Sequence, residues 1–130
     1  MIVDSSALVA ILHREPERAE FVALISASPD VSVSAATYLE AAIVIDAQKR
    51  PDLSREFDRI LAANNIIIEP VTPAQARIAR EAYRDFGKGS GHAARLNFGD
   101  CLAYALAKDK SEPLLFKGTD FAQTDVRVAT

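Results

Sequence analysis

Four acidic residues of the chain could together hold a divalent cation: Asp4, Glu40, Asp100 and Asp120. Four carboxylates without basic partners would repel one another in a dry site, and a bound cation removes that repulsion. Oxygen ligands suit Mg²⁺ or Mn²⁺, whereas Zn²⁺ would be expected to recruit His or Cys. Ions of this kind act on phosphate oxygens and can activate a water for in-line displacement. The two histidines, His13 and His92, lie away from the predicted strand ends, and we interpret His13 as an exposed residue at a helix end.

Short apolar runs predict the strands that must position these acids. Strands are expected at residues 1–3, 31–34, 66–68 and 114–116, with a last edge strand at 126–128. The stretches between them have the apolar spacing of helices. This alternation is typical of an α/β domain with a mainly parallel central sheet. The chain has no internal repeat or linker, so residues 1–130 are expected to form a single domain.

Local signals predict where several helices start and which sides they bury. The expected N-caps are Ser5 or Ser6, Ser34, Thr72 and Asn97. Asn97 would form a loose capping box with Asp100. The helix after Ser34 is expected to reach Arg50 and to bury one stripe of residues: Leu39, Ala42, Ile43 and Ala47. The helix after Asn97 would place four residues on its apolar side: Phe98, Leu102, Ala105 and Leu106.

The four acids belong to one edge of this predicted sheet. Asp4 directly follows the first strand, and Asp120 comes shortly after the strand at 114–116. Glu40 lies early in the helix after the second strand, and Asp100 lies in the first turn of its own helix. Ligands of open parallel sheets bind outside the carboxyl ends of the strands. We therefore expect the four carboxylates to meet at this edge.

Each acid taken alone also has an ordinary structural explanation. Asp4 could cap the first helix, Glu40 could be a solvated helix residue, and Asp120 could be a turn residue. Asp100 could be a helix-start carboxylate that the helix dipole favours. Only their joint placement favours a metal site.

The composition is that of a globular protein, with 49% hydrophobic and 25% charged residues. No apolar run approaches the ~20 residues that span a bilayer, so no membrane segment is expected, and no secretory signal is apparent. Cys101, the only cysteine, is interpreted as a small buried hydrophobe, and a lone cysteine points to a reducing, cytoplasmic compartment. The net charge of −3 gives no support to a long nucleic-acid-binding surface, but it leaves room for a local basic strip.

Four segments carry a resemblance to the PIN-domain ribonucleases, specifically the VapC-type toxins of bacterial toxin–antitoxin pairs. The segments are MIVDSSA (1–7), YLEA (38–41), LNFGDC (96–101) and LLFKGTDF (114–121). They occur in the order of the family and span nearly the whole chain. Each is weak alone, and together they are specific.

The resemblance implies an α/β/α sandwich that cleaves RNA with Mg²⁺ or Mn²⁺ and leaves a 5′-phosphate and a 3′-hydroxyl. Asp4 and Asp100 would be the principal metal ligands, and Glu40 would complete the cluster directly or through water. Asp120 would be the more variable fourth member, and Asp125 competes for that place. The resemblance also implies a cognate VapB-type antitoxin that covers the site, and a toxin homodimer within a larger complex.

Further residues would support the acids or contact the substrate. Ser6, Asn97 and Thr119 would orient carboxylates or waters. The glycine-rich connection at 87–95 is interpreted as a loop beside the site. Three of its side chains could contact RNA phosphates: Lys88, His92 and Arg95.

Two other functions remain open on the sequence alone. A response-regulator receiver is also a small α/β domain with Mg²⁺ and carboxylates at strand ends, and Lys117 after a late strand is a superficial similarity. However, a receiver needs an aspartate after its third strand, and here residues 66–68 run into Glu69 and Pro70. The second alternative is a PIN fold that binds RNA without cleaving it.

Overall fold

The computed structural model describes every residue from Met1 to Thr130. Four short parallel strands form one sheet in the order β3-β2-β1-β4. The strands are β1 (Ile2–Val3), β2 (Ser32–Ser34), β3 (Ile67–Glu69) and β4 (Leu114–Leu115). The helices are α1 (Ser5–Leu12), α2 (Arg18–Ala27), α3 (Ala35–Asp46), α4 (Pro51–Ala63), α5 (Pro73–Phe86), α6 (Phe98–Lys110) and the 3₁₀ helix η1 (Phe121–Gln123).

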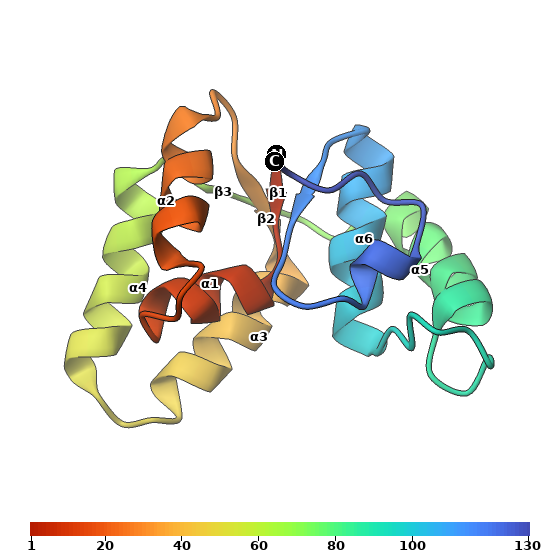
Figure 1. Cartoon of the computed structure of the whole chain (residues 1–130), viewed down its shortest axis with the longest axis horizontal. Helices are drawn as coiled ribbons and strands as arrows, with labels where there is room; N and C mark the ends of the chain where they lie inside the picture. Colours follow the sequence, from red (N-terminus) through yellow and green to blue (C-terminus); the bar gives the residue numbers. More distant parts are fainter.

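Helices cover both faces of this sheet, because successive residues of a strand point to opposite faces. Ile2 and Leu114 join a core of 14 buried residues that includes α5 and α6. Their neighbours Val3 and Leu115 join a core of 19 buried residues that includes α1 to α4. Figure 1 shows α1, α2 and α4 on one side of the strands and α5 and α6 on the other. The predicted three-layer α/β/α sandwich with a parallel sheet is confirmed.

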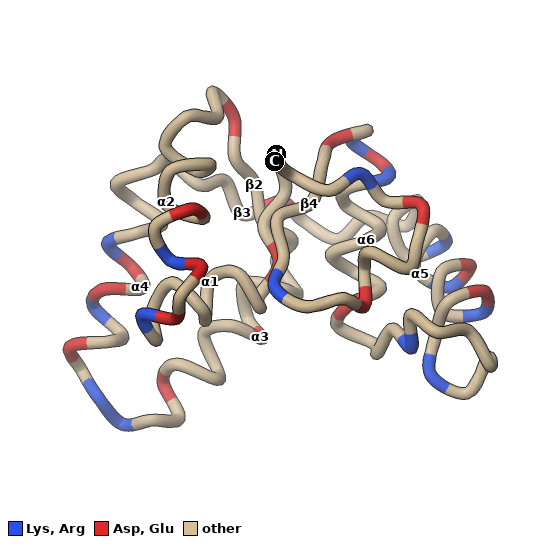
Figure 2. Tube along the Cα trace, viewed as in Figure 1, with Lys and Arg blue, Asp and Glu red and all other residues tan.

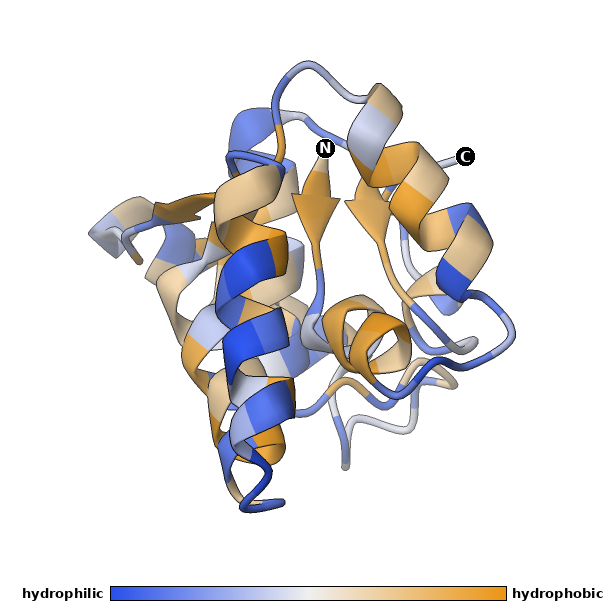
Figure 3. Ribbon diagram, turned by 90° about the vertical axis from the view of Figure 1, so that its left-hand side faces the viewer, coloured by the Kyte–Doolittle hydropathy of each residue, from blue (hydrophilic) through white to orange (hydrophobic).

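The helices α4 and α5 are amphipathic, as their sequences predict. In α4, Phe57, Ile60 and Leu61 are buried while the residues between them are mostly exposed. Viewed from the side of α4, hydrophilic residues cover the outer surface of the nearest helix, and the strands behind it are hydrophobic (Figure 3). In α6, by contrast, Phe98, predicted on the apolar side, is 79% exposed. No helix combines the length and the hydrophobicity that crossing a membrane requires.

The strands differ from the prediction mainly at the edges of the sheet. β3 is displaced by one residue, and it is an edge strand whose Ile67 and Ile68 are exposed. Residues 126–128 form no strand, and only an isolated parallel bridge joins Val128 to Leu114. The outermost segments have fewer partners, so the apolar sequence alone overstates how regular they are.

The predicted buried stripe of α3 is mostly wrong, since only Ala42 of its four residues is partly buried against the core. Leu39 and Ile43 are 57% and 58% exposed, and the residues that face the core are Thr37, Ala41 and Ile45. The helix ends at Asp46, four residues before the predicted end at Arg50. The sequence carries apolar residues on more than one side of this helix, and packing against the sheet and the neighbouring helices decides which side is buried.

The predicted N-caps are only partly confirmed. Thr72 caps α5 by accepting a hydrogen bond from the Gln75 amide at 3.1 Å. Ser34 occupies the N-cap position of α3, but its buried hydroxyl has no hydrogen-bond partner. The first helix is capped by Asp4 rather than by Ser5 or Ser6, which are its first two residues. The ordinary explanation of Asp4 as a cap is therefore correct, whatever else this residue does.

Candidate active site

Asp4 lies at the carboxyl end of β1, where the chain turns into α1. Its Oδ2 accepts hydrogen bonds from the Ser6 amide at 3.0 Å and from the Ser6 hydroxyl at 2.7 Å. The residue is 2% exposed, and its other oxygen, Oδ1, is buried without any hydrogen-bond partner. A buried carboxylate oxygen without a partner is costly, so this atom marks a place for a cation or a proton.

The pKa of Asp4 shows the same cost. The pKa is raised from its usual value to about 6, mainly by burial and also by the nearby charges of Asp100 and Glu40. The two hydrogen bonds from Ser6 oppose this shift, because they stabilise the charged form. Asp4 therefore lies within the electrostatic reach of two of the three other predicted acids.

Glu40 is positioned by contacts with the first turns of α1 and α6. The Ser5 hydroxyl donates a hydrogen bond to its Oε1 at 2.7 Å, which ties α3 to the start of α1. Its Oε2 lies against Gly99 in the first turn of α6, so closely that a Cβ at this position would clash with it. Because Gly99 has no side chain, the carboxylate of Glu40 can lie against α6 at the position directly before Asp100.

Asp100 opens α6 in a complete capping box. The Asn97 side chain accepts from the Asp100 amide at 2.8 Å, and Asp100 Oδ2 accepts from the Asn97 amide at 3.0 Å. Partial burial raises the pKa of Asp100, and the charges of Glu40 and Asp120 add to this increase. The hydrogen bond from Asn97 and the charge of Lys88 act in the opposite direction. Capping occupies one carboxylate oxygen and leaves the other without a role in the helix.

The two candidates for a fourth acid have different surroundings. Asp120 is exposed at the start of η1, and its charge acts on Asp100. Asp125 accepts a 2.6 Å hydrogen bond from the Tyr104 hydroxyl and forms a 3.0 Å ion pair with Lys108. These partners lower the pKa of Asp125, the Tyr104 hydrogen bond most. Asp125 therefore has a local structural role that Asp120 lacks.

The predicted supporting residues differ in how closely they engage the acids. The Ser6 hydroxyl donates to Asp4 and accepts from the Lys117 amide at 3.0 Å, which links the end of β1 to the segment after β4. Asn97 holds Asp100 through the capping box, and Thr119 is exposed. Lys88 and Arg95 are exposed on the connection between α5 and α6, and of these two only Lys88 is among the charges that act on Asp100.

Both histidines make contacts unrelated to the carboxylates. His13 Nε2 lies 2.7 Å from the Gln48 side-chain nitrogen, and His92 Nδ1 accepts from the Ala94 amide at 3.0 Å. His92 also packs edge-on against Phe86. His92 therefore shapes its own loop.

One carboxylate oxygen of the site is placed to bind a cation, but the side chains of the acids would have to move before three of them could bind it together. As the side chains lie, no three His, Cys, Asp or Glu residues form a group that could hold a metal ion. Oδ1 of Asp4 is nevertheless a buried, unpaired oxygen at the carboxyl end of the sheet, where Glu40 and Asp100 add negative charge. Oxygen donors with this excess of charge suit Mg²⁺ or Mn²⁺. The residues present therefore fit such an ion through Asp4.

Two contributors to the site were not predicted. Ser5, expected only as a possible N-cap, holds Glu40, and Gly99 makes room for it. The glycine beside Asp100 was a signal of close approach, since a glycine inside a helix is otherwise unfavourable. The hydroxyl of Ser5 carried no such signal, because its contact is with a residue 35 positions away.

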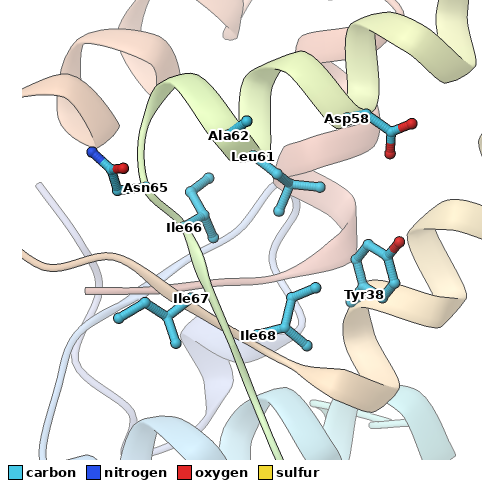
Figure 4. Close-up of a pocket in the computed structure, with 8 residues that line it drawn as sticks. All are labelled: Tyr38, Asp58, Leu61, Ala62, Asn65, Ile66, Ile67 and Ile68. Atoms are coloured by element: carbon cyan, nitrogen blue, oxygen red, sulfur yellow. The ribbon is translucent and has the colours of Figure 1, made fainter.

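An apolar cavity elsewhere in the molecule does not include these acids. It measures about 500 Å³ and lies between α4, β3 and Tyr38 of α3 (Figure 4). Most of its lining is apolar, from Leu61 to Ile68, and Asp58 is its only carboxylate. None of the four predicted acids lines this cavity.

Comparisons with known proteins identify the family of the chain. A family model described as the PIN domain matches residues 1–127. Ribonuclease VapC28 of Mycobacterium tuberculosis is 52% identical over 129 residues, which cover 99% of this chain and 97% of that protein. VapC ribonuclease Mb0640 of Mycobacterium bovis is 46% identical over 126 residues, with 97% and 95% covered.

Solved structures show the same fold at low sequence identity. The crystal structure of M. tuberculosis VapC20, described as a sarcin–ricin loop cleaving toxin, has a TM-score of 0.74 at 18% identity and covers 96% of this chain and 95% of that one. A toxin–antitoxin complex from Klebsiella pneumoniae has a TM-score of 0.69 at 17% identity, with 93% and 89% covered. The family match decides against the receiver alternative. The chain belongs to the PIN-domain family and, within it, to the VapC ribonucleases.

Proposed function

We propose that this VapC ribonuclease is a Mg²⁺- or Mn²⁺-dependent endoribonuclease and the toxin of a toxin–antitoxin pair. The unpaired buried oxygen of Asp4, next to the charges of Glu40 and Asp100, is the observation that supports a cation at the site. The names of the relatives support RNA as the substrate, because proteins 46% to 52% identical over nearly the whole chain are ribonucleases.

Asp4 and Asp100 would be the principal ligands of the cation. Ser6 holds one oxygen of Asp4, and the capping box holds one oxygen of Asp100, so each residue presents its other oxygen in a restricted direction. When bound, the cation would neutralise these carboxylates and activate the water that attacks the scissile phosphate. Glu40, held by Ser5, would join directly or through a water, and Lys88 and Arg95 would contact flanking phosphates.

Asp120 would be the fourth acid. Its carboxylate acts on Asp100 electrostatically, whereas both oxygens of Asp125 already accept from Tyr104 and Lys108. Recruiting Asp125 would break both of these contacts. Asp120 is exposed and can turn toward a cation at little cost.

Cleavage of RNA by matched variants tests this function. Wild type with Mg²⁺ or Mn²⁺ should cleave RNA, and EDTA, Asp4→Asn or Asp100→Asn should abolish cleavage. Asp58→Asn, which removes a carboxylate of the apolar cavity, is the control and should leave the rate unchanged. Full activity of both site variants, or full activity in EDTA, would overturn the proposal. RNA binding without cleavage in Mn²⁺ would instead indicate a PIN fold that only binds.

The partners follow from the family. A cognate VapB-type antitoxin would cover the site, and the similar fold of a toxin–antitoxin complex supports a partner of this kind. Co-expression with the gene product encoded beside it, followed by loss of RNA cleavage, tests the assignment. Cleavage that persists in the purified complex would contradict neutralisation by that partner.

A second copy of the chain would cover an apolar face next to the site. This face comprises the exposed apolar side chains of α3, α5 and α6: Leu39, Ile43, Val44, Tyr83 and Phe98. Two hollows of about 340 and 380 Å³ open on it and share Phe98 and Leu102 in their linings. Exposed apolar patches of this kind mark interaction sites, and the homodimer typical of the family supplies the occupant.

A further inference from the structure

One side of α5 carries a row of arginines that the proposed catalytic site does not use. Arg77, Arg80 and Arg84 are spaced three and four residues apart, which places them on the same side of the helix. Together with Glu81 they line a hollow of about 440 Å³ that contains no hydrophobic residue. The row spans about 10 Å along the helix axis.

The fold does not need these three side chains. All three residues are exposed. Arg77 and Arg80 form none of the ion pairs of the structure, and Arg84 pairs only with its neighbour Asp85, where both side chains are more than half exposed. Exposed pairs of this kind contribute little to stability. Arg77 and Arg84 are therefore free to bind something else, and Arg80, which also borders the 380 Å³ hollow of the apolar face, has no ion pair to give up.

The charge of this region is opposite to that of the rest of the chain. Residues 77–95 contain five basic and two acidic residues, a net charge of +3, in a chain whose net charge is −3. The basic residues are the three arginines of the row together with Lys88 and Arg95. A locally positive strip on an otherwise negative protein favours a polyanion at that place only.

The row leads toward the carboxylates. The connection after α5 carries Lys88 and Arg95 and returns the chain to the start of α6, which contains Asp100. Figure 1 shows α5 beside α6 and the loop that joins them at the end of the molecule where α6 begins. In Figure 2, basic residues mark α5 and this loop.

We propose that Arg77, Arg80 and Arg84 form a track for the phosphates of a single-stranded RNA, continued by Lys88 and Arg95 to the carboxylate site. This inference rests on the proposed function, which brings RNA to that site. Guanidinium groups bind phosphates through paired hydrogen bonds, and phosphate contacts need no apolar surface. The centre of a protein interface is more apolar than this hollow, so a protein partner fits it less well.

Binding of a labelled RNA tests the track without any cleavage. The probe is a fluorescein-labelled, unstructured 20-nucleotide RNA of mixed sequence, measured by anisotropy in EDTA over a range of salt concentrations. The track variant is Arg77→Gln, Arg80→Gln and Arg84→Gln combined. The control combines Arg50→Gln, Arg55→Gln and Arg59→Gln on and beside α4, which changes the net charge by the same amount. Circular dichroism and melting temperature establish that both variants fold.

The track variant should bind about tenfold more weakly than the control variant at low salt. The slope of log K against log salt concentration should also fall by about 2, since each lost phosphate contact on a single strand accounts for about 0.7. A further variant with lysine at the same three positions should keep most of the salt slope, because it keeps the charge. Equal affinities and slopes for the track and control variants would overturn the track.

Two outcomes separate this inference from the proposed function. If wild type does not cleave RNA but the track variant still loses affinity, the proposed function fails and the track stands. If the track variant binds RNA like wild type and instead no longer captures the purified antitoxin, the arginines belong to a protein interface and the RNA track is wrong.

Discussion

At neutral pH the Asp4 carboxyl, with its pKa near 6, is largely ionised although it is buried and one of its oxygens lacks a partner. The folded protein holds a proton on Asp4 between about pH 4 and pH 6 that the unfolded chain has already released. Stability therefore falls as the pH rises through this window, and the loss is complete above pH 6. A carboxylate retained at such a cost points to a function that requires its charge.

Without metal, Asp4→Asn should be more stable than wild type at pH 8, by at most about 3 kcal/mol in the free energy of unfolding. The difference should shrink as the pH falls through 6 and vanish below about 4, because the wild-type residue is then neutral in both states. Urea unfolding in EDTA at several pH values measures it. A less stable variant at pH 8 would show that the N-cap role of Asp4 outweighs its burial.

Asp120 and Asp125 should respond differently to the same change. Asp125→Asn should lower stability slightly and leave the rate of RNA cleavage near that of wild type, because the contacts of Asp125 are with Tyr104 and Lys108. Asp120→Asn should lower the rate and leave stability unchanged. Cleavage rates and melting temperatures of the two variants test this pair. The opposite pattern would make Asp125 the fourth acid.

At the scale of elements, the contact between α3 and α6 decides whether Glu40 reaches the site. Gly99→Ala would place a methyl group against the Glu40 carboxylate and displace it. We expect a loss of cleavage of roughly tenfold or more, because small displacements of catalytic groups are costly. In a Glu40→Ala background the same change should have no further effect, which a double-mutant cycle of cleavage rates measures. Additive losses would mean that Gly99 acts on something other than Glu40.

The elements also show how far sequence reasoning reaches. The carboxyl ends of β1 and β2, the capping box of Asn97 and Asp100, and the proximity of Asp4 to Asp100 could be predicted, because local sequence signals determine them. The buried side of α3 could not, since Thr37 and Ala41 face the core while Leu39 is exposed. Periodicity identifies a helix, but only packing decides which of two apolar sides faces inward.

In the candidate site, too, some features could be predicted from the sequence and others could not. The acids themselves stand out by residue type and position. Their supports, such as Ser5 for Glu40, depend on contacts between helices far apart in sequence. In a similar way, the cap of α1 is Asp4 because the chain turns one residue earlier than the two serines suggest.

At the scale of the whole molecule, the apolar face of α3, α5 and α6 should control the oligomeric state. Wild type should be a dimer by light scattering, and Ile43→Glu should be a monomer, because it places a charge on that face. Val22→Glu, at an exposed position of α2, is the control and should remain dimeric. A wild type that is monomeric at micromolar concentration, or an Ile43→Glu variant that stays dimeric, would contradict this arrangement.

The division of the interior into two cores has a consequence for how the protein loses activity. Asp4 caps α1 and Glu40 lies in α3, two helices of the 19-residue core, whereas Asp100 lies in α6, a helix of the 14-residue core. A partial opening that detaches α5 and α6 would separate the acids while the larger core stays packed. On heating, RNA cleavage should therefore disappear at a lower temperature than the helical circular dichroism signal, and the amides of α5 and α6 should exchange with solvent before those of α1. Coincident loss of both signals would mean that the two cores unfold as one unit.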